Sequence, residues 1–137
     1  MLVSNLSQLK SAVTNKVDKL LGVFAKSHLS YEYRRPKDQP SLMNLTEAAL
    51  ELLMTKSDQG FFLMVEGAKI DHAHHATYAN LALEETLVFD QTIEKTMQML
   101  KEKKLLDDTL VIVTADHSHT MTLPGSPARG ASIKGNM

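Results

Sequence analysis

The sequence contains no cysteine, and this absence limits the kinds of site that it can hold. Without cysteine there is no disulfide framework and no thiolate ligand for a metal ion. Any metal ion would therefore be held by nitrogen and oxygen atoms of histidine and acidic side chains.

An excess of charge of one sign and long apolar runs are also missing. The formal net charge is −1, so no basic excess points to a nucleic-acid backbone as a partner. No apolar run approaches the roughly 18 residues of a membrane span. Residues 1–10 lack the basic and apolar segments of a signal peptide. We therefore expect no nucleic-acid partner and no targeting signal within this sequence.

The 137 residues that are present correspond to one domain or to a piece of a larger one. Apolar residues make up 43% of them, which is enough to bury a core. The histidines are distributed unevenly, because five of the six lie in two short stretches, 72–75 and 117–119. This clustering is more informative than the number of histidines.

Each histidine cluster follows an apolar segment that is typical of a buried strand. Residues 61–66 (FFLMVE) and 109–115 (TLVIVTA) are predicted strands that deliver carboxylates and imidazoles at their carboxyl ends. A helical pattern over residues 75–103 separates them. Strand, helix and strand form a βαβ crossover, so the two strands should be parallel. Ligands bind at the carboxyl edge of such a sheet, which is therefore the expected site.

The remaining sequence predicts further helices and one more strand. The long helix over 75–103 should bury Leu81 and Leu100 and expose Glu84 and Glu85 to solvent. Elsewhere the pattern predicts helices over 5–15 and 41–56, a strand over 20–24, and loops over 26–40 and 116–137. The fold class that follows is α/β, with a mostly parallel sheet and flanking helices.

Asp71 and His75 stand four residues apart, just after the first predicted strand. In a helix that starts near Asp71, this spacing puts both on one face, with Cβ atoms about 5–6 Å apart. That separation suits two ligands of one zinc ion, with bonds of roughly 2.0–2.2 Å. Around Glu66, before the turn, an all-oxygen environment would suit magnesium better. A simpler interpretation stays open, in which Asp71 only caps a helix.

Asp116 and His117 follow the second predicted strand. In a strand they would point to opposite sides, whereas in a loop both would be presented to a second ion. His119 is either a ligand or a residue that donates a hydrogen bond to a ligand carboxylate. His74 is expected to face solvent or to be structural. Either cluster alone is compatible with a solvated surface, but two clusters at one sheet edge favour metal binding.

These stretches resemble the metal-binding motifs of the alkaline phosphatases. The resemblance rests on VEGAKIDHAHH followed by TADHSH, with a long helix between them. It runs through nearly the whole chain and is similar to the animal branch in the segments LLGVFA, YEYRR, QPSLMNLTEAALELL, GFFLMVEG and PARGASIKG.

The resemblance implies two zinc ions, one magnesium ion and a role for each of seven residues. Glu66 matches the magnesium ligand, and Asp71 and His75 match ligands of the first zinc. Asp116 and His117 match ligands of the second zinc. His119 matches a histidine that lies near the first zinc's aspartate without binding the ion, and His72 matches a position near the bound phosphate.

The resemblance also implies a fold, a reaction and a location. The fold would be part of a three-layer α/β sandwich in a homodimer, and the reaction would be hydrolysis of phosphate monoesters at alkaline pH. Animal members are usually secreted and tethered to the outer membrane surface by a lipid anchor, which implies an extracellular, membrane-anchored protein.

Some features of the family have no match here. The Asp-Ser-Ala context of the serine nucleophile is absent, so no catalytic residue is identified, and Ser118 aligns with a variable small residue. The phosphate-clamping arginine, an early aspartate ligand and a late histidine ligand are also unmatched, and Arg129 aligns outside the site. Ala25 and Gln39 align with acidic calcium ligands of animal members, which predicts loss of that site. We therefore expect residues 1–137 to form a single incomplete domain that is inactive alone.

Other functions are compatible with parts of this pattern. The main alternative is a truncated isoform that binds metal without catalysis. A mutase or sulfatase of the wider superfamily would share the metal core but not this run of residues, and the double motif argues against an α/β interaction module. In every case, exposed strand edges predict poor solubility or association.

Overall fold

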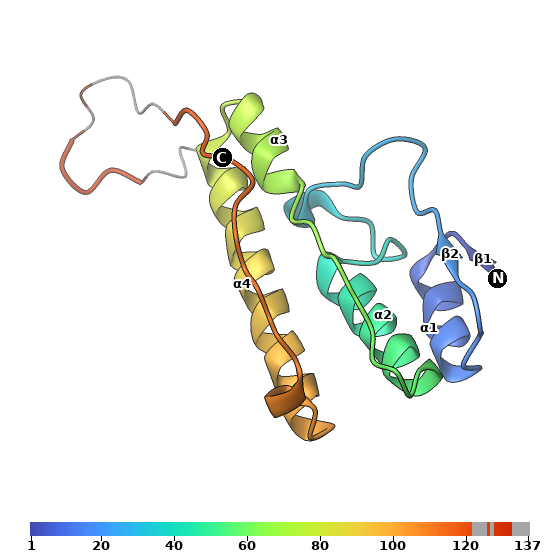
Figure 1. Cartoon of the computed structure of the whole chain (residues 1–137). Helices are drawn as coiled ribbons and strands as arrows, with labels where there is room; N and C mark the ends of the chain where they lie inside the picture. The colour runs from blue at the N-terminus through green and yellow to red at the C-terminus, as the bar shows by residue number, and fades with distance from the viewer. Residues whose placement is uncertain (122–125, 127, 133–137) are drawn as a thin grey trace.

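The computed structural model describes residues 1–121, 126 and 128–132. Within these residues, α2 packs against α1 and α4, and α3 packs beside the upper end of α4 (Figure 1). The elements in chain order are β1 (Leu2–Val3), α1 (Leu6–Thr14), β2 (Leu21–Gly22), the 3-10 helix η1 (Glu32–Arg34), α2 (Leu42–Lys56), α3 (Lys69–His75), α4 (Ala79–Glu102) and the 3-10 helix η2 (Leu106–Asp108). The predicted α/β class is confirmed, although a complete three-layer sandwich is not present in the described part.

The helices predicted over 5–15 and 41–56 are confirmed, and polar caps explain where they begin. The side chain of Asn5 accepts a hydrogen bond from the Gln8 backbone N–H at the start of α1. At the start of α2, Ser41 and Asn44 exchange side-chain-to-backbone hydrogen bonds in a capping box. Each cap satisfies backbone donors that have no partner inside the helix.

The strand predicted over 20–24 is confirmed in a shorter form as β2. It pairs in parallel with β1, with Leu2 opposite Leu21. The strand pair covers a small core in which Val3, Leu9, Ala12 and Ala48 are buried together. This core joins the strand pair to α1 and α2, and it lies far along the chain from the histidine clusters.

The helix predicted over 75–103 is confirmed in a shorter form as α4, and a break at residues 76–78 separates it from α3, which ends at His75. Thr77 adopts a positive φ of 59°. Its N–H donates to the His74 carbonyl, and the Tyr78 N–H donates to the Ala73 carbonyl, which is the hydrogen-bond pattern of a Schellman motif. The motif ends α3 directly after His75 and redirects the chain into α4.

The strands predicted over 61–66 and 109–115 are wrong for the described structure. Both segments are extended but form no ladder, and both run in the same direction toward α3 (Figure 1). They are not buried either, because Phe62, Met64 and Leu110 are 80% exposed or more. A strand needs a neighbouring backbone about 4.8 Å away, and no other described segment supplies one. The two segments therefore run in the same direction, as predicted for a βαβ unit, but they do not form a sheet.

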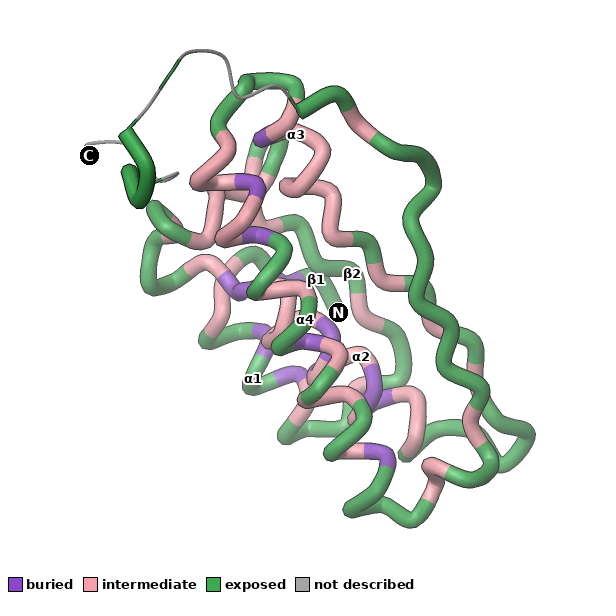
Figure 2. Tube along the Cα trace, turned by 90° about the vertical axis from the view of Figure 1, so that its left-hand side faces the viewer, coloured by how far each residue is buried: buried purple, intermediate pink, exposed green. Residues whose placement is uncertain are grey.

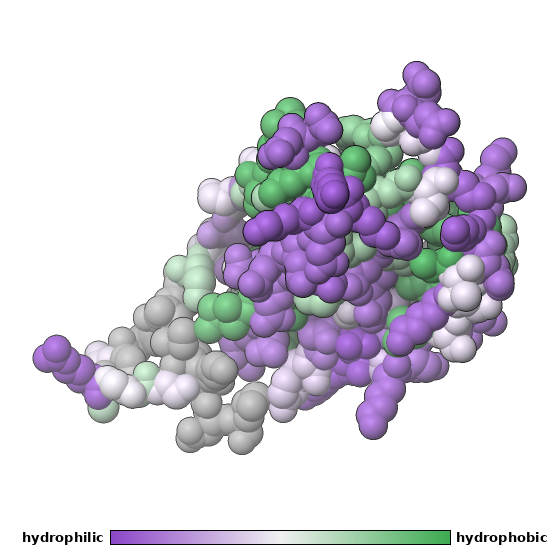
Figure 3. Space-filling model, turned by 90° about the horizontal axis from the view of Figure 1, so that it is seen from below, coloured by the Kyte–Doolittle hydropathy of each residue, from purple (hydrophilic) through white to green (hydrophobic). Residues whose placement is uncertain are grey.

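The exposed surface reflects this open arrangement. Figure 2 shows the buried residues gathered where the helices meet, while most of the trace is exposed or intermediate. Hydrophobic residues also reach the surface between hydrophilic ones on the face in Figure 3. None of the described helices combines the length and the apolar character needed to cross a membrane. Part of the predicted loop over 116–137, including Pro124 and Gly135, lies outside the described residues.

Candidate metal centre

Helix α3 brings Asp71 and His75 together as the sequence spacing predicts. The two residues are one helical turn apart, and His75 Nε2 lies 3.5 Å from Asp71 Oδ2. Gly67 precedes the helix, and a Cβ on it would come within 3.1 Å of the Phe89 ring. Because Gly67 has no side chain, its backbone can lie close to Phe89 of α4, and α3 begins beside α4.

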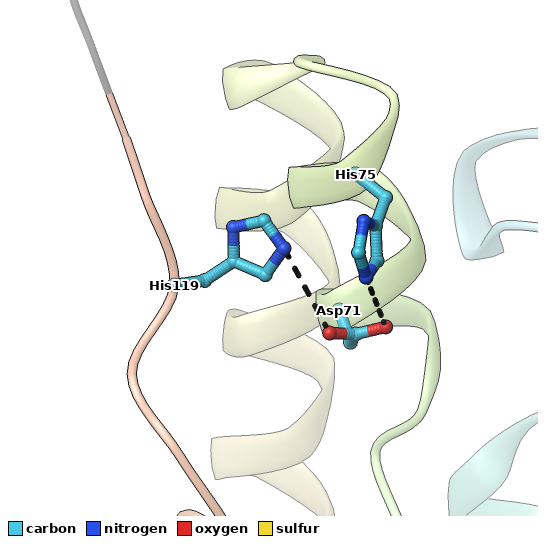
Figure 4. A group of neighbouring side chains, drawn as sticks. All are labelled: Asp71, His75 and His119. Atoms are coloured by element: carbon cyan, nitrogen blue, oxygen red, sulfur yellow. Dashed lines mark ion pairs between the residues drawn. The ribbon is translucent and has the colours of Figure 1, made fainter.

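The extended segment after η2 carries two more imidazoles to the same carboxylate. His119 Nε2 lies 3.9 Å from Asp71 Oδ1, and His117 Nε2 lies 4.0 Å from the same atom. Figure 4 shows His75 facing one oxygen of Asp71 and His119 facing the other from the neighbouring segment. Residues 46 or more positions apart in the sequence thus meet at one carboxylate.

Asp71, His75 and His119 form a group, called here the Asp71 trio, whose donor atoms suit a metal ion. One donor atom from each of these residues lies within 4.8 Å of the other two. Asp71 Oδ1 is buried and has no hydrogen-bond partner among the described residues. A buried carboxylate oxygen without a partner is costly, and a cation between it and the imidazoles would remove that cost. The residues therefore fit a zinc ion chemically.

The backbone fixes the tautomers of the two histidines on the extended segment. His117 Nδ1 lies 2.9 Å from the Ser118 carbonyl oxygen, and His119 Nδ1 lies 3.1 Å from the Thr120 carbonyl oxygen. A carbonyl oxygen only accepts, so each Nδ1 donates. In the neutral ring each Nε2 then carries the lone pair, the state in which histidine binds metals; the Nε2 of His119 lies beside Asp71 and that of His117 is closest to Asp116.

Asp116 and His117 lie beside the trio as a more exposed pair. His117 Nε2 is 3.2 Å from Asp116 Oδ2, and the Asp116 side chain is 87% exposed. The pKa of His117 is raised, first by the hydrogen bond to the Ser118 carbonyl and then by the charge of Asp116. The two side chains are adjacent in a segment without strand pairing and contact each other; their presentation to a second ion stays a prediction.

Glu66 and His72 line a pocket beside α3. The pocket has a volume of about 140 Å³, is also lined by Lys69 and Glu85, and includes no member of the trio. Lys69 Nζ is 3.3 Å from His72 Nδ1. The pKa of His72 is lowered, chiefly by burial and then by the charge of Lys69. Within the described residues, the predicted magnesium ligand and the predicted phosphate-proximal residue are thus neighbours on one side of α3.

Sequence reasoning missed two residues of this pocket. The ring of His28 packs edge-on against the ring of His72, with centroids 4.4 Å apart. Glu85, predicted to face solvent, is instead buried, and its Oε1 accepts a hydrogen bond of 2.6 Å from the Glu32 N–H. Neither contact has a signal in the sequence, because each joins segments more than 40 residues apart. His74 is half-buried and stacks on His119 at 5.2 Å.

The alkaline phosphatase family model matches residues 1–137. This chain belongs to the alkaline phosphatase family. It is 41% identical over 134 residues to a membrane-bound alkaline phosphatase of Bombyx mori, covering 97% of this chain and 24% of that protein. It is 42% identical to alkaline phosphatase 4 of Drosophila melanogaster, covering 98% and 22%, and 44% identical to the tissue-nonspecific isozyme of Rattus norvegicus, covering 97% and 25%.

The family assignment confirms the resemblance drawn from the two motifs, and it includes the expected animal members. The chain spans about a quarter of the length of these curated relatives. Gln39 occupies a position where animal alkaline phosphatases were expected to carry a calcium ligand. Here its side-chain amide forms hydrogen bonds to the backbone at two places in the loop before α2. Its Oε1 accepts from the Ser30 N–H at 3.0 Å, and its Nε2 donates to the Phe24 carbonyl at 3.3 Å.

Proposed function

We propose that this chain is part of an alkaline phosphatase that uses two zinc ions and one magnesium ion to hydrolyse phosphate monoesters. The observation that carries the proposal is the meeting of Asp71, His75 and His119 at one end of the fold, in a chain of this family. The alternative of a solvated histidine cluster does not account for a buried carboxylate oxygen that has no hydrogen-bond partner among the described residues.

In this proposal the two motifs supply ligands for separate ions. Asp71 and His75 hold the first zinc, Asp116 and His117 hold the second, and Glu66 holds the magnesium. Zinc ions held by these residues would supply Lewis-acid stabilisation for the displacement at phosphorus. The protein ligands contribute only two carboxylates and neutral imidazoles to the zinc pair, so the site keeps enough positive charge to hold a phosphate dianion.

His72 would contribute a hydrogen-bond donor to the phosphate. The Lys69 ammonium only donates, so its 3.3 Å contact makes His72 Nδ1 the acceptor. The ring proton of neutral His72 is then on Nε2, and the lowered pKa of His72 favours this neutral state. An Nε2 proton held in this way suits a phosphate oxygen, which is the role that we assign to His72.

The decisive experiment is a chimera in which residues 1–132 replace the matching quarter of the rat tissue-nonspecific isozyme. We expect the chimera to hydrolyse p-nitrophenyl phosphate, and the same chimera with Asp71→Ala to lose at least 100-fold in kcat/KM, because a catalytic zinc needs its protein ligands. A Glu94→Gln chimera, which alters an exposed carboxylate on α4, controls for general effects of substitution. A folded chimera without turnover, or with turnover unaffected by Asp71→Ala, would contradict the proposal.

The 137-residue chain by itself should not turn over, because its sequence contains no Asp-Ser-Ala nucleophile motif. Metal binding without catalysis is the second candidate function, and the assembly of the Asp71 trio within this one chain favours it. Zinc retention without hydrolysis would support this candidate for the isolated chain. Zinc-dependent turnover by the isolated chain would exclude it.

We further propose that the complete protein forms a homodimer at the outer membrane surface. One relative is itself described as membrane-bound, and lipid anchoring is usual among the animal members that the sequence resembles. Release of the protein from cells by a phospholipase that cleaves lipid anchors, followed by light scattering on the released material, tests the location and the dimer separately.

A further inference from the structure

We propose that Asn44 carries an N-linked glycan whose first sugars cover an apolar groove between α1, α2 and α4. Asn44, Leu45 and Thr46 form an Asn-X-Thr sequon, in which the asparagine accepts an oligosaccharide when the central residue is not proline. The inference rests on the proposed location at the outer membrane surface, because proteins that reach this surface pass through the compartment where such glycans are added.

Within the described residues, the acceptor nitrogen of Asn44 takes part in no hydrogen bond. Asn44 stands in the first turn of α2, where its Oδ1 accepts a hydrogen bond of 3.2 Å from the Ser41 N–H. The Nδ2 amide group of Asn44 has no partner among the described residues. A glycan replaces one hydrogen of Nδ2 and leaves Oδ1 in place. The capping box at the start of α2 therefore survives the modification.

Asn44 lines the groove itself, which has a volume of about 440 Å³. Leu9 and Val13 of α1 and Met99 of α4 supply apolar surface, while Lys10 of α1 adds a charged group. A sugar ring has an apolar face of C–H groups and an edge of hydroxyl groups. It therefore matches a concave surface that is mostly apolar with a few polar groups.

Two ion pairs hold the wall of the groove that α2 and α4 form. Lys95 Nζ lies 3.6 Å from Glu47 Oε1, and Lys103 Nζ lies 3.2 Å from Glu51 Oε1. Both glutamates also line the groove, so the carboxylates are present to accept hydrogen bonds from sugar hydroxyls. The walls are thus helices that contact one another across the groove floor.

The tether is the reason for choosing a glycan as the occupant. A sugar bonded to Asn44 Nδ2 begins at a side chain that lines the groove. Its effective concentration there is high, so even weak contacts with the apolar surface keep it in place. A separate partner would first have to overcome the loss of its own translational and rotational freedom.

The transfer forms a bond between Asn44 Nδ2 and the anomeric carbon of the first sugar. The donor is an oligosaccharide carried on a lipid diphosphate. The bond from the anomeric carbon to the diphosphate breaks, the diphosphate leaves with the electron pair, and Nδ2 gives up one proton to water. No atom is oxidised or reduced.

The folded structure indicates when this transfer takes place. The hydroxyl of Thr46, which completes the sequon, is buried with its residue only 5% exposed. Its Oγ1 donates a hydrogen bond of 2.9 Å to the Leu42 carbonyl. Once α2 has formed, a transferase cannot reach this hydroxyl. The glycan is therefore added before α2 folds.

Site-specific mass spectrometry on the chimera, expressed in animal cells, tests the modification. Digestion with a peptide N-glycosidase in heavy-oxygen water converts each glycosylated asparagine to a labelled aspartate. We expect the label at Asn44 in the wild-type chimera, its loss in Thr46→Ala, and its return in Thr46→Ser, which keeps the hydroxyl. Asn5, in the second sequon Asn5-Leu6-Ser7, is the internal control and should be labelled equally in all three forms. An unlabelled Asn44 in the wild-type chimera would overturn the inference.

Methionine oxidation tests whether the glycan lies in the groove. Met99 lines the groove, whereas Met97 of the same helix is 36% exposed and does not line it. Oxidation of methionine by peroxide follows its exposure. We expect Met99 to oxidise several-fold more slowly in the glycosylated chimera than after enzymatic removal of the glycan, with Met97 unchanged. Equal rates for Met99 in the two forms would overturn the proposed covering.

These outcomes can be told apart from those of the proposed function. Asn44 and Thr46 are not among the residues assigned to metal or phosphate, so Thr46→Ala should leave kcat/KM for p-nitrophenyl phosphate unchanged. An active chimera with an unlabelled Asn44 would overturn the glycan and support the phosphatase proposal. A folded, inactive chimera with a labelled Asn44 would do the reverse.

Discussion

At the scale of single residues, Glu85 differs most from its sequence expectation. The helical pattern predicts that it faces solvent, yet it is buried and accepts a hydrogen bond from the Glu32 backbone. Burial raises its pKa, the backbone hydrogen bond opposes this, and the charge of Glu32 adds to the rise. The folded protein therefore holds a proton on Glu85 more tightly than the unfolded chain does.

Glu85→Gln should stabilise the protein at neutral pH by about 1 kcal/mol, because an amide keeps the acceptor and removes a buried charge. A raised carboxyl pKa contributes stability that is fully present below the unfolded pKa and is lost as the pH rises through the folded pKa. The advantage of the variant should therefore grow from pH 4.5 upward. Urea unfolding at several pH values measures it.

Glu94→Gln is the matched control, since it removes an exposed carboxylate from the same helix. Its unfolding free energy should follow that of wild type at each pH. If Glu85→Gln gained nothing at neutral pH relative to this control, the burial argument for Glu85 would be wrong.

At the scale of elements, three helices end in the same way. After α1, α3 and α4, the chain adopts a positive φ at Lys16, Thr77 and Lys104, with the two hydrogen bonds of a Schellman motif. Glycine is the residue best suited to this conformation, so each of these ends carries strain. At Thr77 the strained turn also sets where α3 stops, directly after His75.

Lys104→Gly should raise the unfolding free energy by about 0.5–1 kcal/mol, because glycine adopts the left-handed conformation without the Cβ penalty. Lys101→Gly, inside the last turn of α4, is the control and should lower it by about 1 kcal/mol. Chemical denaturation of both variants gives the two values. Equal destabilisation by the two glycines would show that the end of α4 is not strained.

At the scale of the whole molecule, two extended apolar segments have one uncovered side. Phe62 and Met64 point outward while their neighbours are partly buried, and Leu110 and Ile112 are likewise 75% exposed or more. Such segments are ready to pair with another strand. The chain spans about a quarter of its relatives' length, so in a longer protein other segments would cover them.

The isolated chain should therefore associate at micromolar concentration, and the double variant Phe62→Ser, Ile112→Ser should shift it toward the monomer. Sedimentation velocity measures the change. The control is the double variant Ser57→Ala, Ser118→Ala, which alters exposed polar positions near the ends of the same segments and should sediment like wild type. A wild-type chain that is monomeric and folds cooperatively would contradict this prediction.

Some of this structure was predictable because its causes are local. The ends of α1 and α2 follow from Asn5 and Ser41, and the shared face of Asp71 and His75 follows from their spacing of one helical turn. The strand predictions over 61–66 and 109–115 failed because an apolar, β-branched pattern describes a segment suited to a sheet but supplies no neighbour to pair with.

The sequence by itself determined the family, the helices and the chemical type of any metal site, which must use nitrogen and oxygen donors. Only the tertiary structure decided that His119 faces Asp71 Oδ1, that Glu85 is buried, and that Glu66 lines one pocket with His72. The physical reason is the separation along the sequence over which each interaction acts. Capping and helical spacing act within one turn of the chain, whereas these contacts depend on how segments separated by tens of residues pack.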